Sequence, residues 1–418
     1  MTTFSVTGGR PLRGRITVPG DKSISHRALL LAALAEGTSV VRGLSDGDDV
    51  ARTRAAVEAM GATFDGDKIT GGRGLLHEPG DVLDLGNSGT GIRLLAGLCA
   101  GLPWLTVLTG DASIRRRPMD RVLEPLRSLG ARIHGRDGGR LAPLVVVGQQ
   151  LHGADVSIPV PSAQVKSAVL LAALSAEGET VVRQDQPTRA HTEEMLAASG
   201  VEVDVSGGGR IVRLRPSPPQ PFELDVPGDP SQAAFWIVAA CIVPGSDVVV
   251  DDVYIGPART GFLDVLRRMG ADVDQVDERA IRARYSPDLQ GTGIRGEEIP
   301  GLVDEIPVLA VAGAVASGLT GYAGVGELRL KESDRVASVI EALAALGATA
   351  TYDDEGLHIR GGARLRGATA HSHWDHRIAM ALAVAGLAAE GSTTIEGWEA
   401  VATSYPGFER DLETLCGS

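Results

Sequence analysis

Residues 16–34 read ITVPGDKSISHRALLLAAL, and residues 224–240 read LDVPGDPSQAAFWIVAA. Each stretch combines a β-branched start, a Pro-Gly-Asp turn and an apolar segment that an Asp or Ser can cap. The two near-copies predict a strand, a turn and a buried helix, each occurring twice. Their separation divides the chain into halves, and we expect the strand before the first turn to pack with the second half.

Both near-copies belong to a longer repeat. The starts of six Ala- and Leu-rich helices are expected near Arg27, Gly91, Ser167, Ser231, Ile306 and Arg377. Each is followed by a strand and a charged helix, and the spacing of roughly 65–75 residues predicts six subunits grouped as three and three. Helices that are apolar on all sides are buried, whereas the amphipathic helices cover the outside. The pattern predicts an α/β architecture.

The composition is typical of a globular protein and argues against a surface that binds nucleic acid. The 418 residues are 43% hydrophobic and 22% charged, with a formal net charge of −13. An acidic chain lacks the basic face that nucleic-acid binding requires. The three Cys residues are expected to be reduced thiols. No segment has the pattern of a signal peptide or a membrane span, so a cytoplasmic protein without membrane contact is expected.

The motif DKSISHR (21–27) places cations at the start of a helix. Lys22 and His26 share one helix face, as do Ser23 and Arg27. Cations in the first turn oppose the helix dipole by roughly 0.3–1 kcal/mol each, and a bound anion removes that penalty. The motif predicts an anion site, with a solvated helix start as the alternative.

Three further motifs in the first half carry donors for anions. LGNSGTGIR (85–93) has glycines that let backbone N–H groups approach a ligand, although it matches neither the dinucleotide nor the Walker pattern. DASIRRRPMDR (111–121) has three adjacent arginines, of which at least one is expected to bind a carboxylate or phosphate. PSAQVKS (161–167) supplies Ser162 and Gln164 at a helix start. An ordinary turn or cap is the alternative for the first and third.

In the second half, LVDEIPVLA (302–310) leaves Asp304 and Glu305 beside a buried helix, where a carboxylate with a raised pKa would suit a general base and helix capping is the alternative. LRLKESDRV (328–336) is expected to place Lys331 and Arg335 on one helix face. Such a like-charge pair needs an anion, or neutralisation by Glu332 and its neighbours.

HSHWDHRIA (371–379) contains His371, His373 and His376, whose spacing is a weak metal signal. Arg377, in the first turn of a buried helix, is the more informative residue for an anion. Arg117 is expected, like Lys331 and Arg335, to come from one of the charged second helices.

Taken together, PGDKSISHR, LGNSGTGIR, RRRPM, PSAQVKSA, KESDR and DHRIAM resemble the motif set of the 5-enolpyruvylshikimate-3-phosphate synthase family, in its order and across essentially the whole chain. The residues of these motifs are most similar to those of the class II bacterial branch of the family. The resemblance implies a two-domain inside-out α/β barrel of six βαβαββ units, three per domain. The expected domains are residues 20–226 and residues 1–19 plus 227–418, with the active site in the interdomain cleft.

The resemblance also implies a reaction and its residues. Enolpyruvyl is transferred from phosphoenolpyruvate to the 5-hydroxyl of 3-phosphoshikimate, and phosphate is released without a metal or an organic cofactor. The implied catalytic residues are Asp304, Glu332 and Lys22, with His376 nearby. The implied 3-phosphoshikimate-binding residues are Lys22, Ser23, Arg27, Ser162, Ala163, Gln164, Thr188, Arg189, Asp304 and Lys331. The implied phosphoenolpyruvate-binding residues are Lys22, Asn87, Gly89, Arg117, Gln164, Arg335 and Arg377.

The chain departs from the family pattern in two places. Thr403 stands where the family commonly has a Lys, which affects one phosphoenolpyruvate contact. Gly89 stands where glyphosate-tolerant class II members carry Ala, and Leu94 replaces the Pro of class I enzymes. We expect Gly89 to leave room for glyphosate as an inhibitor competitive with phosphoenolpyruvate, and we expect a monomer.

Three alternative functions are considered, of which a sister reaction is the nearest and the other two belong to different classes. The sister transferases that act on UDP-N-acetylglucosamine carry Lys-Asn at the first motif and usually a Cys in a mobile loop, whereas this chain has Lys22-Ser23 and no Cys in RRRPM. A non-catalytic anion-binding protein would not need Asp304, Glu332 or Lys22. A metal-dependent hydrolase would use the histidines of residues 371–376.

Overall fold

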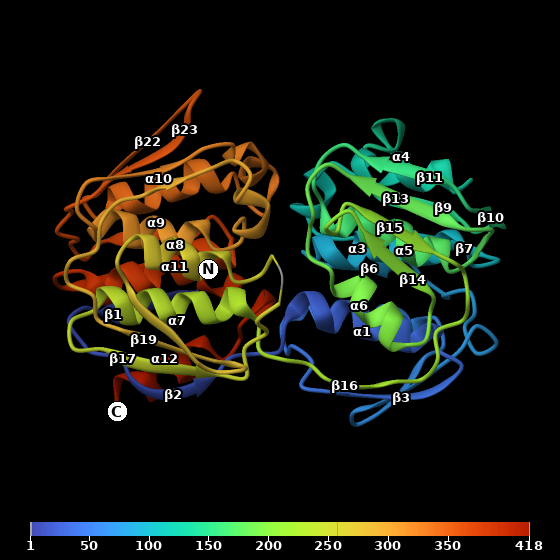
Figure 1. Ribbon diagram of the computed structural model, residues 1–418, viewed down its shortest axis with the longest axis horizontal. Helices are drawn as coiled ribbons and strands as arrows, with labels where there is room; N and C mark the ends of the chain where they lie inside the picture. The colour runs from blue at the N-terminus through green and yellow to red at the C-terminus, as the bar shows by residue number, and fades with distance from the viewer. Residues whose placement is uncertain (1, 257, 418) are drawn as a thin grey trace. The chain divides into compact units, whose positions relative to one another are not determined.

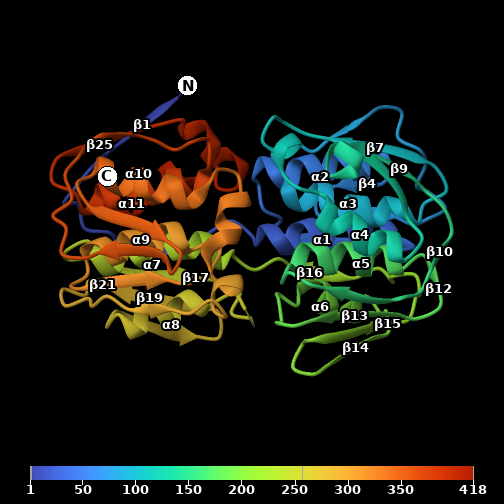
Figure 2. The same ribbon diagram turned by 90° about the horizontal axis from the view of Figure 1, so that it is seen from above.

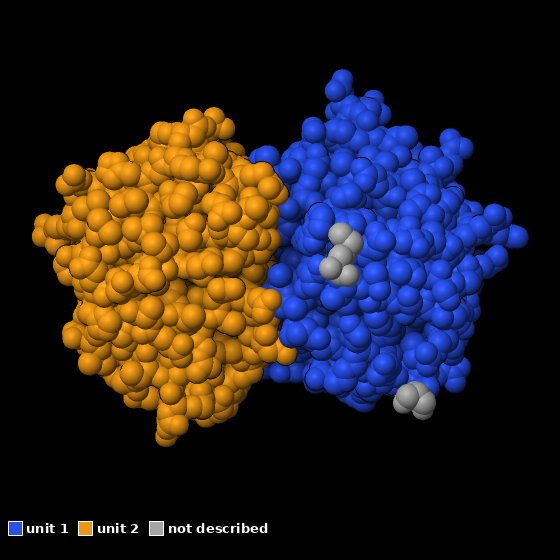
Figure 3. Space-filling view, turned by 180° about the vertical axis from the view of Figure 1, so that it is seen from behind, with its two compact units in different colours: residues 1–19, 227–418 blue, residues 20–226 orange. Residues whose placement is uncertain are grey.

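The computed structural model describes residues 2–256 and 258–417. The chain divides into two compact units (Figure 3). Unit 1 consists of Met1–Pro19 and Pro227–Ser418, and unit 2 consists of Gly20–Val226. The chain therefore passes from one unit to the other at the two Pro-Gly-Asp turns.

The sheets of unit 2 share one topology. Each four-stranded sheet has one parallel pair, formed by its first two strands, followed by two antiparallel pairings. In spatial order, the strands are β16 (Glu223–Asp225), β3 (Gly37–Arg42), β5 (Lys68–Gly71) and β4 (Thr63–Asp65); β6 (Leu83–Asp84), β7 (Leu105–Thr109), β9 (Leu141–Val147) and β8 (Arg132–Arg136); β11 (Asp155–Ile158), β13 (Thr180–Gln184), β15 (Ile211–Leu214) and β14 (Val203–Ser206). A two-stranded parallel sheet joins β10 (Leu151–His152) to β12 (Ala176–Glu177).

The sheets of unit 1 repeat this arrangement, with one sheet reduced to three strands. In spatial order, the strands are β18 (Asp272–Asp277), β19 (Ala280–Arg284), β17 (Asp247–Asp251) and β2 (Arg13–Thr17); β20 (Gly293–Ile294), β21 (Leu319–Tyr322), β23 (Gly356–Arg360) and β22 (Thr349–Asp353); β1 (Thr3–Thr7), β25 (Ser392–Glu396) and β24 (Thr369–His371). The pairing of β2 with β17 is parallel. The strand before the first Pro-Gly-Asp turn therefore packs with the second half of the chain, as expected from the sequence.

Each unit has a core of small-residue helices. In unit 2 these are α1 (Lys22–Leu34), α3 (Gly89–Ala100) and α5 (Ala163–Ala173), and in unit 1 they are α7 (Pro230–Ile242), α9 (Ile306–Val315) and α11 (His376–Ala388). In unit 1 the three helices pack against one another, with the sheets around them (Figures 1 and 2). In unit 2, α3 packs against both α1 and α5.

Small residues allow these helices to approach closely. Gly97 in α3 is one case, because a Cβ there would lie 2.1 Å from the carbonyl oxygen of Ala168 in α5. The helices start within a few residues of the positions expected from the sequence, since an Asp or Ser caps each start in five of the six. These side chains are Asp21, Ser88, Ser162, Asp229 and Asp375.

The charged helices bury one face and expose the other, as the sequence predicts. They are α2 (Asp48–Ala59), α4 (Asp120–Ser128), α6 (His191–Ala198), α8 (Gly261–Arg268), α10 (Arg335–Ala345) and α12 (Phe408–Cys416). Within the described residues, the helices are all too short or too polar to cross a membrane.

Candidate active site

The first group of candidate residues lies at the start of α1 in unit 2. The Asp21 carboxylate accepts the N–H of Ile24 and caps the helix. Lys22 Nζ lies 2.9 Å from the carboxylate of Asp49 in α2, which compensates a cation in the first turn. Arg27 donates to the hydroxyl and the carbonyl of Ser23 at 2.7 Å, so the two residues share a helix face as predicted.

Arg27 also joins three helices. Its side chain is 1% exposed, and it donates from Nε to Thr192 of α6 and from Nη2 to Ser167 of α5. Those two hydroxyls are 2.6 Å apart. A buried guanidinium with several fixed acceptors has little rotational freedom, so the starts of α1, α5 and α6 are held in one arrangement.

The second group lies around the start of α3. Arg117 donates from Nη2 to the side-chain oxygen of Asn87 at 2.7 Å, and it is almost fully buried. Gly89 lies directly beside it, because a Cβ on Gly89 would be 2.7 Å from Arg117 Nη1. The expectation that Arg117 comes from a charged helix is wrong. Arg117 follows a short 3₁₀ helix (Ile114–Arg116), since Pro118 comes next and α4 starts only at Asp120.

The start of α5 forms the third group. The Ser162 hydroxyl accepts the N–H of Val165 at 3.4 Å, which is a weak cap, and Ala163 is the first helical residue. Gln164 accepts from Arg93 Nη1 at 2.8 Å and donates to Thr90 at 2.9 Å. These contacts connect α5 to α3, so the second and third groups adjoin.

Thr188 and Arg189 lie in the segment before α6, and both are partly exposed. The Thr188 hydroxyl donates to Gln184, and its carbonyl accepts from the Nζ of Lys166. Lys166 is buried in an ion pair with Glu193 of α6. Burial lowers the pKa of the Lys166 ammonium, and the adjacent Glu193 carboxylate opposes that effect.

The fourth group lies in unit 1, around the guanidinium of Arg335. This side chain is 1% exposed, and its Nε, Nη2 and Nη1 lie 2.9 Å from Asp375, 2.6 Å from Glu332 and 3.2 Å from Asp304. Burial alone lowers the pKa of a guanidinium, but the three carboxylates outweigh it and raise the pKa of Arg335 above its usual value. One buried cation therefore fixes both predicted acid–base carboxylates.

The expectation that Lys331 and Arg335 share a helix face is wrong. The segment Val325–Leu330 is a 3₁₀ helix, Lys331 follows it, and α10 starts at Arg335. The physical reason is the Asp334 carboxylate, which accepts the N–H of Ala337 and starts a new helix. Lys331 nonetheless belongs to this group. Burial lowers the pKa of its ammonium, and the carboxylate of Asp304 opposes part of that shift.

Arg377 has unused donors at the start of α11. Its side chain is 2% exposed, and its Nε and Nη1 have no hydrogen-bond partner among the described residues. Its backbone N–H donates to Asp375, the same residue that pairs with Arg335. Unpaired buried donors are costly, and a cationic side chain in the first turn of a helix attracts an anion. The two features support an anion site at Arg377.

The three histidines of residues 371–376 contact neighbouring side chains. The ring of His371 stacks edge-on against Trp374, and His373 lies 2.9 Å from Glu341. His376 Nδ1 lies 3.1 Å from the hydroxyl of Thr403, the residue that stands in place of the family Lys. In the parts of the chain that the structure describes, no three His, Cys, Asp or Glu residues are grouped as a metal site would need.

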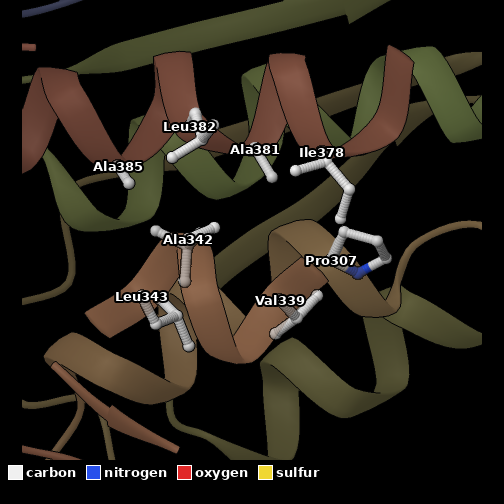
Figure 4. Close-up of a pocket in the computed structure, with 9 residues that line it drawn as sticks. Pro307, Val339, Ala342, Leu343, Ile378, Ala381, Leu382 and Ala385 are labelled. Carbon is white, nitrogen blue, oxygen red and sulfur yellow. The ribbon is translucent and has the colours of Figure 1, made fainter. Parts of the chain in front are cut away.

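The helices that carry the unit 1 group share an apolar core. Pro307 of α9, Val339 of α10 and Ile378 of α11 line a small cavity, with no polar side chain among its lining residues (Figure 4). The candidate residues Asp304, Arg335 and Arg377 therefore stand at the starts of three helices that are packed together. This packing determines how the polar groups are spaced.

Several contact residues were missed from the sequence. Arg93 is a cation close to the start of a buried helix, as Arg27 and Arg377 are, so the same signal could have found it. Asp375 lies in the HSHWDHRIA motif directly before a buried helix, so its role as a cap also has a local signal. Asp49 carries no local signal, because its role depends on a partner 27 positions away.

The chain matches known proteins along its length. The family model for EPSP synthase (3-phosphoshikimate 1-carboxyvinyltransferase) matches residues 6–412. A 3-phosphoshikimate 1-carboxyvinyltransferase of Herpetosiphon aurantiacus is 51% identical, over 97% of each chain. The solved structure of an EPSP synthase from Acinetobacter baumannii is similar with a TM-score of 0.86 and 39% identity, over 99% of this chain and 98% of that one.

A protein with lower sequence identity has a similar fold. The enolpyruvyl transferase NikO from Streptomyces tendae has a TM-score of 0.77 at 20% identity, over 98% of this chain and 96% of that one. That likeness shows the enolpyruvyl transferase α/β fold. The family match and the full-length relatives show more, and the chain belongs to the EPSP synthase (3-phosphoshikimate 1-carboxyvinyltransferase) family of enzymes.

Proposed function

We propose that the chain transfers the enolpyruvyl group of phosphoenolpyruvate to the 5-hydroxyl of 3-phosphoshikimate, giving 5-enolpyruvylshikimate 3-phosphate and phosphate. One observation carries the proposal most directly. Arg335 and Arg377 are both buried and both donate to Asp375, the cap of α11, and Arg377 has unused donors among the described residues. Because phosphoenolpyruvate brings a carboxylate and a phosphate, it satisfies donors of this kind.

The 3-phosphoshikimate is bound mainly by unit 2. Its phosphate is held by Ser162, Ala163 and Gln164 at the start of α5, together with Thr188 or Arg189. Its carboxylate faces Arg27, with Lys22 and Ser23 alongside. The fixed position of Arg27 supports this assignment, because Thr192, Ser167 and Ser23 accept from its three nitrogens and hold the guanidinium beside Ser23.

Phosphoenolpyruvate is bound by residues of both units. Arg117, Gly89, Asn87, Gln164 and Lys22 act from unit 2, and Arg335 and Arg377 act from unit 1. We propose that the two groups act on the same pair of substrates. The charge count supports this proposal, since two carboxylates and two phosphates need more cations than either group supplies alone.

Asp304 acts as the base for the 5-hydroxyl, with Lys331 beside the same hydroxyls. As the oxygen forms its bond to C2 of phosphoenolpyruvate, Glu332, together with Lys22, delivers a proton to the methylene carbon. In the second step the C2–O bond to phosphate breaks, and the same groups remove a proton from the resulting methyl carbon. Atoms and charge balance without a metal or an organic cofactor, and the cations stabilise the leaving phosphate.

The proposal includes the finer architecture. Six βαβαββ units, three per domain, form two inside-out α/β barrels, with domains at residues 20–226 and 1–19 plus 227–418. The shared strand order of the four-stranded sheets supports this repeat. We also propose a cytoplasmic monomer, in keeping with the unpaired thiols of Cys99, Cys241 and Cys416.

The test is phosphate release from phosphoenolpyruvate with 3-phosphoshikimate as the acceptor. UDP-N-acetylglucosamine is the control acceptor, and we expect turnover with 3-phosphoshikimate alone. Asp304→Ala and Glu332→Ala should each abolish turnover while leaving the circular dichroism spectrum unchanged, and Asp304→Asn should keep a weak residual rate. Turnover only with the control acceptor would reassign the substrate, and no turnover with either would indicate a non-catalytic anion-binding protein. Loss of activity on chelation would contradict the metal-free reaction.

A further inference from the structure

A second buried polar network lies in unit 1, at the start of α7. Arg259 donates from Nη2 to Asp229 at 2.6 Å and from Nη1 to the Ser231 hydroxyl at 3.1 Å. The Ser231 hydroxyl in turn donates to the carboxylate of Glu305. All four residues are at most 2% exposed. Hydrogen bonds in a buried network are strengthened by the low local dielectric, so the geometry of these contacts is well determined.

The end of this network is the residue next to Asp304. Glu305 precedes α9 and is buried, whereas Asp304 is partly exposed and contacts Arg335. Both residues lie before the first residue of α9, in a turn where the N–H of Glu305 donates to the carbonyl of Leu302. The side chain of Glu305 therefore anchors the turn that carries Asp304 to the start of α7.

The two near-copied motifs differ in what this serine does. In VPGDKS, the Ser23 hydroxyl accepts from Arg27 on its own helix. In VPGDPS, Ser231 stands at the corresponding place, and its hydroxyl reaches Glu305, 74 positions away. One copy therefore holds a predicted substrate-binding residue, and the other connects to the predicted base. The second motif is more than a crossover between the units.

We propose that Ser231, supported by Arg259, is a positioning residue that fixes the Asp304 carboxylate through Glu305 for deprotonation of the acceptor hydroxyl. The inference rests on the role proposed for Asp304. Arg259, Ser231 and Glu305 are buried and contact one another, so the proposal assigns them no substrate contact. Their effect is on the orientation of a base, and a displacement of about 1 Å in a reacting group can cost a hundredfold in rate.

The experiment compares Ser231→Ala with Ser246→Ala. Ser246 is also a buried serine of unit 1, and its hydroxyl accepts the N–H of Leu12, away from Glu305. We expect Ser231→Ala to lower kcat by about tenfold to a hundredfold with KM for phosphoenolpyruvate nearly unchanged. Ser246→Ala should lower the melting temperature and keep kcat, and Ser231→Thr, which keeps the hydroxyl, should recover most of the rate.

A double variant tests whether the effect passes through Asp304. In the weakly active Asp304→Asn background, adding Ser231→Ala should change kcat by no more than about twofold, because residues that act as a unit are not additive. If Ser231→Ala does not fold, Glu305→Gln tests the same connection from its other end. A normal kcat for Ser231→Ala, or an equal further loss in the Asp304→Asn background, would overturn the inference. Absence of turnover in the unmodified chain would instead refute the proposed function.

Discussion

The Asp375 carboxylate caps α11 and at the same time pairs with the buried guanidinium of Arg335, 2.9 Å away. Its other oxygen accepts the backbone N–H of Arg377. One aspartate thus connects the two arginines that are proposed to hold phosphoenolpyruvate. The helix cap and the charge balance of the anion site depend on the same side chain.

Asp375→Asn should separate these two roles. An amide oxygen still caps the helix, but the negative charge beside Arg335 is lost. Truncating one partner of a buried charge pair costs roughly 2–5 kcal/mol, and Glu332 and Asp304 offset part of that cost here. We expect kcat/KM for phosphoenolpyruvate to fall by about tenfold to a hundredfold, measured by phosphate release under steady-state conditions.

The control is Asp334→Asn, since Asp334 caps the neighbouring helix α10 and pairs with Arg329 on the surface. That variant should keep kcat/KM within about twofold, because surface ion pairs contribute at most about 1 kcal/mol. An equal loss in both variants would show that the activity does not depend specifically on the negative charge beside Arg335.

Gly89→Ala should affect phosphoenolpyruvate and glyphosate unequally. A Cβ at this position lies 2.7 Å from Arg117 Nη1, so the arginine must shift. Overpacking of this kind costs about 1–3 kcal/mol, which is roughly tenfold to a hundredfold in binding. We expect glyphosate to inhibit the unmodified enzyme competitively with phosphoenolpyruvate. In the variant, the inhibition constant should rise more than KM.

Gly74→Ala is the matched control for steady-state inhibition measurements, since a Cβ on Gly74 meets no atom within 4 Å. It should leave both constants unchanged. If Gly89→Ala raised KM and the inhibition constant by the same factor, the expected room for glyphosate beside Gly89 would be refuted.

Lys166 and Glu193 should behave as a coupled buried pair. Their side chains are 1% and 4% exposed and lie 2.5 Å apart. Lys166→Met leaves the Glu193 carboxylate buried without its ion-pair partner, which typically costs about 3–5 kcal/mol in the free energy of unfolding. Lys166→Met combined with Glu193→Leu should recover most of that loss. Urea denaturation measures both, and additive losses in the double-mutant cycle would contradict the coupling.

The sequence predicted the helix starts well because their signals are local. An Asp or Ser cap before an apolar run specifies where α1, α3 and α11 begin, whatever surrounds them. The same holds for Arg377 in the first turn of α11 and for Arg27 in the second turn of α1, since both follow the cap closely in the sequence. Both arginines can therefore be predicted from the residues next to them in the sequence.

The contacts that hold those residues could not be predicted in this way. Asp375 reaches Arg335 across 40 positions, and Ser231 reaches Glu305 across 74. The helix predicted over residues 328–336 failed for a related reason. The charges of Lys331 and Arg335 fit a helical spacing, but the cap at Asp334 competes locally and starts the helix later.

Lys331 gives a pH-dependent prediction. Burial lowers the pKa of its ammonium below the free-lysine value of 10.5, and Asp304 opposes part of the shift. Lys331 therefore loses its proton at a lower pH than an exposed lysine does. If the ammonium holds the hydroxyls of 3-phosphoshikimate, kcat/KM for this substrate should decline as pH rises through that lowered pKa.

Lys331→Arg should move the decline to higher pH, since a guanidinium stays charged over the accessible range. The measurement compares kcat/KM for 3-phosphoshikimate in Lys331→Arg and in the unmodified enzyme from about pH 6 to pH 10. Lys68→Arg, at an exposed position of β5, is the control and should leave the profile unchanged. An alkaline limb at the same pH in Lys331→Arg and the unmodified enzyme would show that another group controls it.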